Sequence, residues 1–187
     1  MRQLPRTSVG PRSGEPATFV EVVRERAQQA PDAETFTFLE TGEMAGSRQV
    51  LCNAALERRA RAIGARLQSL GLAGERALLV YAPGLHYVEG FLGCLFGGVI
   101  AVPVYPPDPR RLARTLPRLQ AVVRDARAAA VLTPSDLAAV GDASTSIAPD
   151  LASLRWVHSA LVDPGEADAW RAPSLGPDSL AFLQHTS

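Results

Sequence analysis

The fold is decided by residues 77–104, which read ALLVYAPGLHYVEGFLGCLFGGVIAVPV. Residues 77–82 (ALLVYA) form a short, continuous apolar run, which is typical of a strand buried on both faces of a parallel sheet. Residues 100–104 (IAVPV) are the next predicted strand. The segment between them repeats apolar residues at steps of three and four, which predicts a helix, and its glycines indicate a close approach to the sheet. The repeating positions are Leu85, Val88, Leu92, Leu95 and Val99.

The same alternation continues further along the chain. Asp108 is expected to cap a second helix and Pro109 to start it. Pro117 lies inside this helix and removes a backbone donor, which predicts either a kink or two helices, the second starting at Pro117. Residues 129–133 (AAVLT) are the following strand. Strand, helix, strand, helix and strand in this order predict right-handed crossovers, hence an α/β fold with a mostly parallel sheet and flanking helices.

A helix and a β-hairpin are predicted ahead of this sheet. Thr18 followed by Glu21 forms a capping-box pattern, and apolar residues at helical spacing then predict a helix over residues 19–30. Residues 34–40 (ETFTFLE) alternate in character, and a turn separates them from residues 49–51. These two runs predict an antiparallel hairpin.

The remaining segments complete the predicted domain. Asn53 is a candidate N-cap for a long amphipathic helix that Gly71 ends. Residues 155–159 (RWVHS) predict a short strand, and residues 179–184 (SLAFLQ) predict another buried strand. Loops with short helical turns are expected for residues 134–150, and an irregular surface for residues 164–177.

Length and composition limit the classes of function. A chain of 187 residues with 47% hydrophobic composition builds one domain, or part of a larger one. Residues 1–17 are interpreted as a flexible leader because they lack the apolar stretch of a secretory signal, so the domain covers residues 18–187. The formal net charge is +0, which argues against a nucleic-acid partner. The most apolar run, residues 91–104, is shorter than the roughly 20 residues of a membrane span, so a cytoplasmic protein is expected.

Few residues carry a recognisable reactive pattern. Cys52 and Cys94 lie far apart without a CxxC motif and are interpreted as buried, reduced thiols. His86 and His158 have no neighbouring Cys, Asp or Glu at a metal-ligand spacing, so structural or surface roles are favoured and no metal site is predicted. All 19 basic residues are Arg. A phosphate-binding Lys would therefore lie outside this chain, and no catalytic residue is assigned.

Arginines are concentrated on the helix that follows Asp108, with only Asp125 nearby to oppose them. A solvated helix face is the favoured interpretation, and a docking surface for an acidic carrier protein or a phosphopantetheine arm is the alternative. The arginines are Arg110, Arg111, Arg114, Arg118, Arg124 and Arg127.

Two segments together resemble the fatty acyl-AMP ligases. They are GLHYVEGFLGCLFGGVIAVPVYPPDPRRLARTLPRLQAVVRDARAAAVLT (residues 84–133) and LAFLQHTS (residues 180–187). The resemblance covers residues 19–187 and implies the N-terminal part of an adenylate-forming domain, truncated at its phosphate-binding loop. In that family the second segment continues into a Gly/Ser/Thr-rich loop with a Lys that holds the ATP phosphates. Thr186 and Ser187 match the first two residues of that loop and are the candidate cofactor-binding residues.

The resemblance also implies an activity for a longer parent enzyme. The parent would use ATP and Mg²⁺ to activate a fatty acid as an acyl-adenylate and would pass the acyl group to an acyl carrier protein. It could be free-standing, or fused to or acting with a polyketide or nonribosomal peptide synthetase. The fragment alone is expected to be inactive, to bind no cofactor tightly, and to aggregate or partly unfold. The alternatives are a noncatalytic α/β interaction or nucleotide-binding module, and a fragment of an acyl-CoA ligase or amino-acid adenylation domain.

Overall fold

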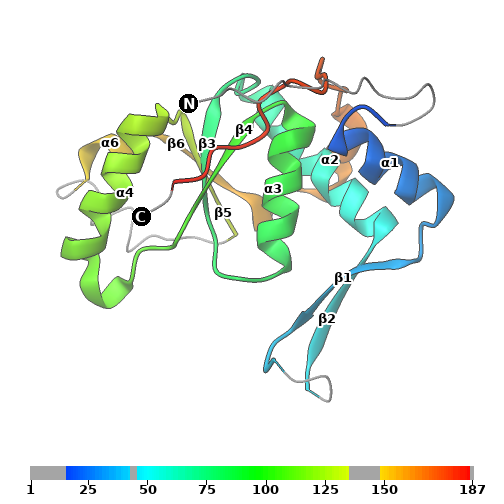
Figure 1. Cartoon of the computed structure of the whole chain (residues 1–187), viewed down its shortest axis with the longest axis horizontal. Helices are drawn as coiled ribbons and strands as arrows, with labels where there is room; N and C mark the ends of the chain where they lie inside the picture. The colour runs from blue at the N-terminus through cyan, green and yellow to red at the C-terminus, as the bar shows by residue number, and fades with distance from the viewer. Residues whose placement is uncertain (1–15, 43–45, 135–147, 186–187) are drawn as a thin grey trace, which may run out of the picture.

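The computed structural model describes residues 16–42, 46–134 and 148–185 of the chain (Figure 1). Its centre is a four-stranded sheet in the order β4-β3-β5-β6, and each neighbouring pair is parallel. The α/β prediction with a parallel sheet is confirmed. The strands are β3 (Arg76–Val80), β4 (Ile100–Val104), β5 (Ala130–Thr133) and β6 (Arg155–His158).

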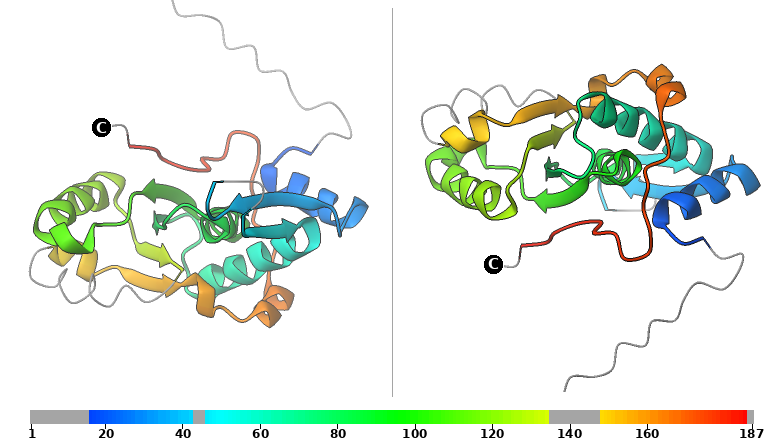
Figure 2. Two further views of the ribbon diagram at one scale, coloured as in Figure 1. Left: turned by 90° about the horizontal axis from the view of Figure 1, so that it is seen from below. Right: turned by 90° about the horizontal axis from the view of Figure 1, so that it is seen from above.

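Helices cover both faces of the sheet, as the two views of Figure 2 show. Alternate residues of β3 explain this, because Ala77 and Leu79 belong to one buried cluster while Leu78 and Val80 belong to another. The first cluster includes residues of α2 (Asn53–Ser69), and the second includes residues of α4 (Leu112–Ala126). The first face is also covered by α3 (Leu85–Gly97), and the second by α6 (Pro149–Ala152).

The glycines of α3 serve mainly the contact with α2. A Cβ atom built on Gly93 would lie 2.4 Å from Cγ2 of Ile63 in α2, and one on Gly64 of α2 would lie 2.9 Å from the carbonyl carbon of Phe96. Only Gly90 meets the end of a strand, since its Cβ would lie 2.5 Å from the Tyr81 hydroxyl. The expected close approach is therefore chiefly between two helices rather than between helix and sheet.

The N-terminal helix and hairpin form as predicted. The Thr18 side chain accepts from the Glu21 amide and Glu21 accepts from the Thr18 amide, so the capping box starts α1 (Phe19–Gln29). The antiparallel pair of β1 (Glu34–Leu39) and β2 (Arg48–Cys52) projects away from the body of the molecule in Figure 1.

Asn53 is not the N-cap of α2, so that prediction is wrong. Cys52 occupies the cap position and makes no side-chain capping bond. Asn53 is the first residue of the helix, and its Nδ2 atom donates to the carbonyl of Ala30 at 2.9 Å. The carbonyl of Ala30, just after α1, also accepts from the Ala33 amide at 3.2 Å, so the Asn53 side chain adds a second hydrogen bond there and ties α1 to α2.

Pro117 does not divide its helix, so the alternative of a second helix starting there is wrong. α4 is continuous across Pro117. The change of geometry comes earlier, at the 3₁₀ helix η1 (Pro109–Arg111), where the Asp108 side chain accepts from the Arg110 amide as expected for a cap. A proline removes only one backbone donor. The apolar residues of α4 before and after Pro117 are both buried against the sheet, so the helix continues through it.

The chain after β6 is more ordered than predicted. Residues 159–161 and 164–169 form the 3₁₀ helices η2 (Ser159–Leu161) and η3 (Pro164–Ala169). Ala167 is fully buried, and Arg66 of α2 pairs with Glu166 at 2.5 Å. This contact with α2 orders a segment that its Pro, Gly and Asp content marks as irregular. Most of the predicted loop 134–150 lies outside the described residues.

The C-terminal segment is not the buried strand that its sequence predicts. It contacts the sheet through one parallel bridge, between Phe182 and Ala101 of β4. Leu180 is 53% exposed and Phe182 46% exposed. Within the described part of the chain the segment is paired along one edge only, which leaves the backbone groups of its other edge unpaired, and no described element buries the side chains of Leu180 and Phe182.

Candidate functional site

The carboxyl ends of three strands meet at a buried polar cluster. The Tyr81 hydroxyl, just after β3, donates to Ser159 Oγ at 2.8 Å, and Ser159 Oγ donates to the carbonyl of Thr133 in β5 at 3.2 Å. Ser159 itself follows β6. The chain passes from β3 to β4 on one side of β3 and then to β5 on its other side, so the order of the strands reverses here, and ligand crevices of open α/β sheets form at such a reversal.

Arg59 of α2 completes this cluster from the helix layer. Its Nη1 donates to the carbonyl of Val162 at 2.6 Å, and its Nη2 donates to the carbonyl of Ser159. Its Nε lies 3.7 Å from Oε2 of Glu89 in α3, and the two side chains are only 16% and 12% exposed. Arg59 therefore fixes the backbone that follows β6 and is itself held by a carboxylate.

Burial determines the protonation state of the cluster. Desolvation raises the pKa of Tyr81 far above its ordinary value, and the hydrogen bond with Ser159 offsets this only in part. The phenol is thus neutral at physiological pH. Tyr81 donates to Ser159, Ser159 links two strands, and Arg59 binds two carbonyls. These contacts hold the carboxyl ends of the strands in fixed positions.

The two histidines singled out from the sequence lie near this edge. His86 is in the first turn of α3, and its Nδ1 lies 3.0 Å from Oε2 of Glu89. The statement that no Asp or Glu stands at a metal-ligand spacing from His86 is wrong, because Glu89, three positions later on the helix, lies on the same face. His158 ends β6. The Arg59 and Glu89 pair was missed because two charged residues 30 positions apart on different helices carry no local signal.

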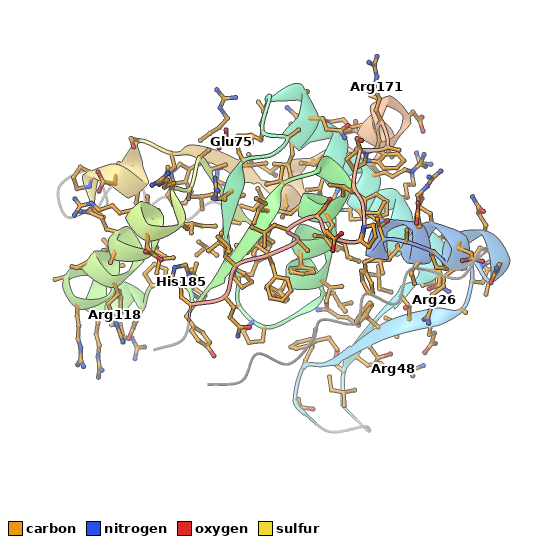
Figure 3. All side chains as sticks on the ribbon, turned by 45° about the horizontal axis from the view of Figure 1, so that its top comes forward. Arg26, Arg48, Glu75, Arg118, Arg171 and His185 are labelled. Atoms are coloured by element: carbon orange, nitrogen blue, oxygen red, sulfur yellow. The ribbon has the colours of Figure 1, made fainter. Side chains whose placement is uncertain are left out.

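The predicted cofactor residues, Thr186 and Ser187, lie outside the described residues. The segment that leads to them is held in place. The amide of Ala101 donates to the carbonyl of Ala181 at 3.0 Å, and the amide of Leu183 donates to the carbonyl of Ala101 at 2.9 Å. His185, labelled in Figure 3, places Nε2 2.8 Å from Oδ2 of Asp125 in α4.

An aromatic series connects the polar cluster to this segment. Ring centroids lie 6.4 Å apart between Tyr81 and Tyr87, 6.2 Å between Tyr87 and Phe91, and 5.8 Å between Phe91 and Phe182. Such separations are those of favourable aromatic contacts. The end of β3 and the C-terminal segment are thus joined through one face of α3.

A small apolar cavity of about 160 Å³ lies on another side of α3. It is lined by the start of α1, the end of α3 and residues 175–181, with Phe19, Leu95 and Leu180 among its side chains. This volume is below the roughly 300 Å³ at which sites for small-molecule ligands begin. The cavity therefore does not replace the carboxyl edge as the candidate site.

The described residues do not fit a resident metal ion. Within residues 16–42, 46–134 and 148–185 no group of three or more His, Cys, Asp or Glu side chains converges on one point. No chemical step through Mg²⁺ is therefore derived from them. In the same ranges, no helix has both the length and the apolar character that crossing a bilayer requires.

Comparison with known proteins places this arrangement in a family. The medium-chain-fatty-acid acyl-carrier-protein ligase JamA of Moorena producens is 34% identical over 172 residues, which are 91% of this chain and 29% of JamA. The long-chain-fatty-acid AMP ligase FadD26 of Mycobacterium tuberculosis is 35% identical over 169 residues, 89% of this chain and 28% of FadD26.

A solved structure agrees with these relatives. The fatty acyl-adenylate ligase from L. pneumophila, in complex with acyl adenylate and pyrophosphate, superimposes with a TM-score of 0.74 at 32% identity, covering 90% of this chain and 28% of that one. The chain spans less than a third of the length of these relatives. The AMP-binding enzyme family itself matches residues 23–187. Because this match covers nearly all of a chain that folds as a parallel α/β domain, the chain belongs to the family of AMP-binding enzymes.

Proposed function

We propose that this chain is the N-terminal portion of a fatty acyl-AMP ligase. The enzyme would join a fatty acid to the AMP part of ATP, release pyrophosphate, and pass the acyl group to an acyl carrier protein in the cytoplasm. The observation that carries the proposal is the combined sequence and structural likeness to the L. pneumophila ligase over 90% of the chain. The names of JamA and FadD26 support the same substrate class.

The chain would act as the base of the nucleotide site. The fatty-acid carboxylate attacks the α-phosphorus and pyrophosphate leaves, so the site must position both reactants and stabilise negative charge. Thr186 and Ser187 would begin the loop around the phosphates. The bridge at Ala101 and the contact of His185 with Asp125 would fix the direction in which that loop starts.

The groups that stabilise the charge are proposed to lie outside this chain. The sequence contains 19 basic residues, all of them Arg, whereas the phosphate loop that the family resemblance implies contains a Lys. Mg²⁺, which would neutralise the phosphates when bound, would likewise need ligands from elsewhere. The fragment alone is therefore expected to be inactive.

The test is exchange of labelled pyrophosphate into ATP. The open reading frame that contains this chain, with whatever follows Ser187, should catalyse exchange that depends on decanoic or palmitic acid, and residues 1–187 should not. Exchange that depends on an amino acid, or robust exchange by residues 1–187 alone, would contradict the proposal. Transfer of the acyl group to a holo acyl carrier protein rather than to CoA separates this enzyme from an acyl-CoA ligase. A parent fused to a carrier domain would acylate itself.

A further inference from the structure

The exposed surface of η1 and α4 carries a concentration of positive charge. Six arginines between positions 110 and 127 are all exposed. Arg111 lies 3.9 Å from Asp108, and Arg124 pairs with Asp150. Arg114 and Arg118 have no carboxylate partner in the described part of the chain. The six are Arg110, Arg111, Arg114, Arg118, Arg124 and Arg127.

Three of these side chains form one stripe at the start of α4. Arg114 and Arg118 lie four positions apart in the helix and share one of its faces, and Arg111 is the N-cap residue just before its first turn. That face is opposite to the buried Leu116 and Leu119. The guanidinium groups repel one another, and no acidic residue stands in the first turn of α4 to balance the positive end of the helix dipole. The stripe is thus complementary to an anionic surface.

The structure favours a protein partner over a lipid surface. An amphipathic helix binds a bilayer by inserting its apolar face, but α4 turns that face to the sheet. The formal net charge of the chain is +0, so it lacks the long-range field that attracts polyanions. Planar guanidinium groups bind carboxylates with two parallel hydrogen bonds, which suits an acidic protein helix.

The position of the stripe relates it to the reaction. His185 contacts Asp125, and Asp125 lies two helical turns after Arg118 on the same side of α4. The segment leading to Thr186 and Ser187 therefore passes beside the helix that carries the stripe. A partner bound to the stripe would stand next to the proposed nucleotide site.

We infer that the stripe of Arg111, Arg114 and Arg118, hereafter the α4 stripe, docks an acidic face of the acyl carrier protein that accepts the acyl group. The inference rests on the proposed function for the identity of the partner. The arginines of the α4 stripe would contact carboxylates of the carrier protein at the rim of the interface. Such contacts speed association and weaken as salt rises.

The test compares two double charge reversals in the full reading frame. Arg114→Glu with Arg118→Glu alters the α4 stripe, and Arg26→Glu with Arg171→Glu is the matched control. Figure 3 shows Arg26 and Arg171 on the side of the molecule away from Arg118, and neither pairs with a carboxylate of the described residues. Both variants change the net charge equally. Thermal melts of both establish that they fold, and Arg114→Ala with Arg118→Ala replaces the first if it does not.

The probe is an acyl carrier protein labelled with a fluorophore, and its anisotropy gives the Kd at low and high NaCl. The α4 variant should raise the Kd about tenfold or more and lose most of its salt dependence, while the control changes it less than about twofold. A carrier with Lys in place of acidic residues on its docking helix should regain affinity for the α4 variant. Equal carrier binding by both variants would overturn the inference.

Two further readouts separate the possible failures. Pyrophosphate exchange with fatty acid should be equal in the wild type and both variants; if no preparation exchanges, the proposed function fails while the carrier affinities still decide the docking surface. Co-sedimentation with phosphatidylserine vesicles tests the lipid alternative. Loss of vesicle binding confined to the α4 variant, with carrier affinity unchanged, would assign the stripe to a membrane and overturn the inference.

Discussion

The ring of Phe182 lies edge-on against the ring of Phe91, with centroids 5.8 Å apart and the planes inclined at 63°. Phe91 belongs to α3, while Phe182 also forms the backbone bridge with Ala101 of β4. Two elements of the core therefore hold the C-terminal segment at one residue. The ring contact and the bridge together position the segment that continues to His185.

Replacing Phe182 by Ala should loosen the segment locally. An aromatic pair contributes about 1 kcal/mol beyond its buried area, which corresponds to about fivefold faster opening. The amides of Ala101 and Leu183, which make the two bridging hydrogen bonds, should exchange with solvent faster by that factor. Phe36→Ala is the control, because Phe36 is similarly exposed but lies in the hairpin. Unchanged exchange in Phe182→Ala would show that the backbone bridge alone is sufficient.

The central layers could be predicted from the sequence because their signals are local. The apolar run at residues 77–80 and the three-and-four spacing over residues 85–97 each specify one element. The capping box of Thr18 and Glu21 is also contained within a few residues. Right-handed crossovers then leave few ways to connect strands that alternate with helices.

The errors arise where a distant partner decides the structure. Asn53 looks like an N-cap, but the carbonyl of Ala30 recruits its amide instead. Residues 179–184 look like a buried strand, but whether such a run is buried depends on what packs against its two faces. The link between Tyr81 and Ser159 joins positions 78 residues apart. Spacing along the chain cannot reveal such a pair.

Gly64→Ala should destabilise the contact between α2 and α3. The new methyl group would lie 2.9 Å from both the carbonyl carbon and Cβ of Phe96, and a helix backbone cannot yield without moving the helix. We expect a loss of about 2 kcal/mol in the free energy of unfolding, although Ala by itself favours a helix by about 1 kcal/mol over Gly. Urea titration measures the difference. Gly176→Ala, with no atom within 4 Å of the new methyl group, should change stability by less than about 0.5 kcal/mol.

Tyr81→Phe should change how stability depends on alkaline pH. Burial raises the pKa of Tyr81 in the folded chain, so above about pH 10 the unfolded chain ionises this phenol while the folded chain keeps it protonated. The unfolded state then binds fewer protons, and stability falls with rising pH by up to about 1.4 kcal/mol per unit. The stability that Tyr81 contributes is fully present below the ordinary tyrosine pKa. It is lost as the pH rises toward the pKa of Tyr81 in the folded chain.

The phenylalanine variant should lack this part of the alkaline slope. Urea titrations at a series of pH values between about 9 and 11 measure it. The buried Cys94, whose pKa is also raised by desolvation, should keep its own contribution in both proteins. Tyr105→Phe is the control because Tyr105 is 93% exposed. An identical slope in wild type and Tyr81→Phe would mean that Tyr81 ionises equally easily in the folded chain.

Arg59→Ala should be the most damaging change at the carboxyl edge. It removes the donors to the carbonyls of Ser159 and Val162 and leaves the mostly buried Glu89 without its guanidinium partner. Hydrogen bonds from charged groups contribute about 1.5–3 kcal/mol each, so we expect a loss of about 3 kcal/mol in the free energy of unfolding. The amide of Val162, which donates to Ser159, should exchange faster with solvent.

The neighbouring Arg58 supplies the control for this loss. Arg58 is exposed on the same helix, so Arg58→Ala should change stability by less than about 0.5 kcal/mol. Arg59→Lys keeps the charge but cannot reach two carbonyls with one planar group, so its loss should fall between those of the two alanine variants. If Arg59→Lys were as stable as the wild type, Arg59 would contribute through its charge near Glu89. Its two hydrogen bonds to the carbonyls of Ser159 and Val162 would then not be needed. Equal losses in Arg58→Ala and Arg59→Ala would instead assign the effect to the helix alone.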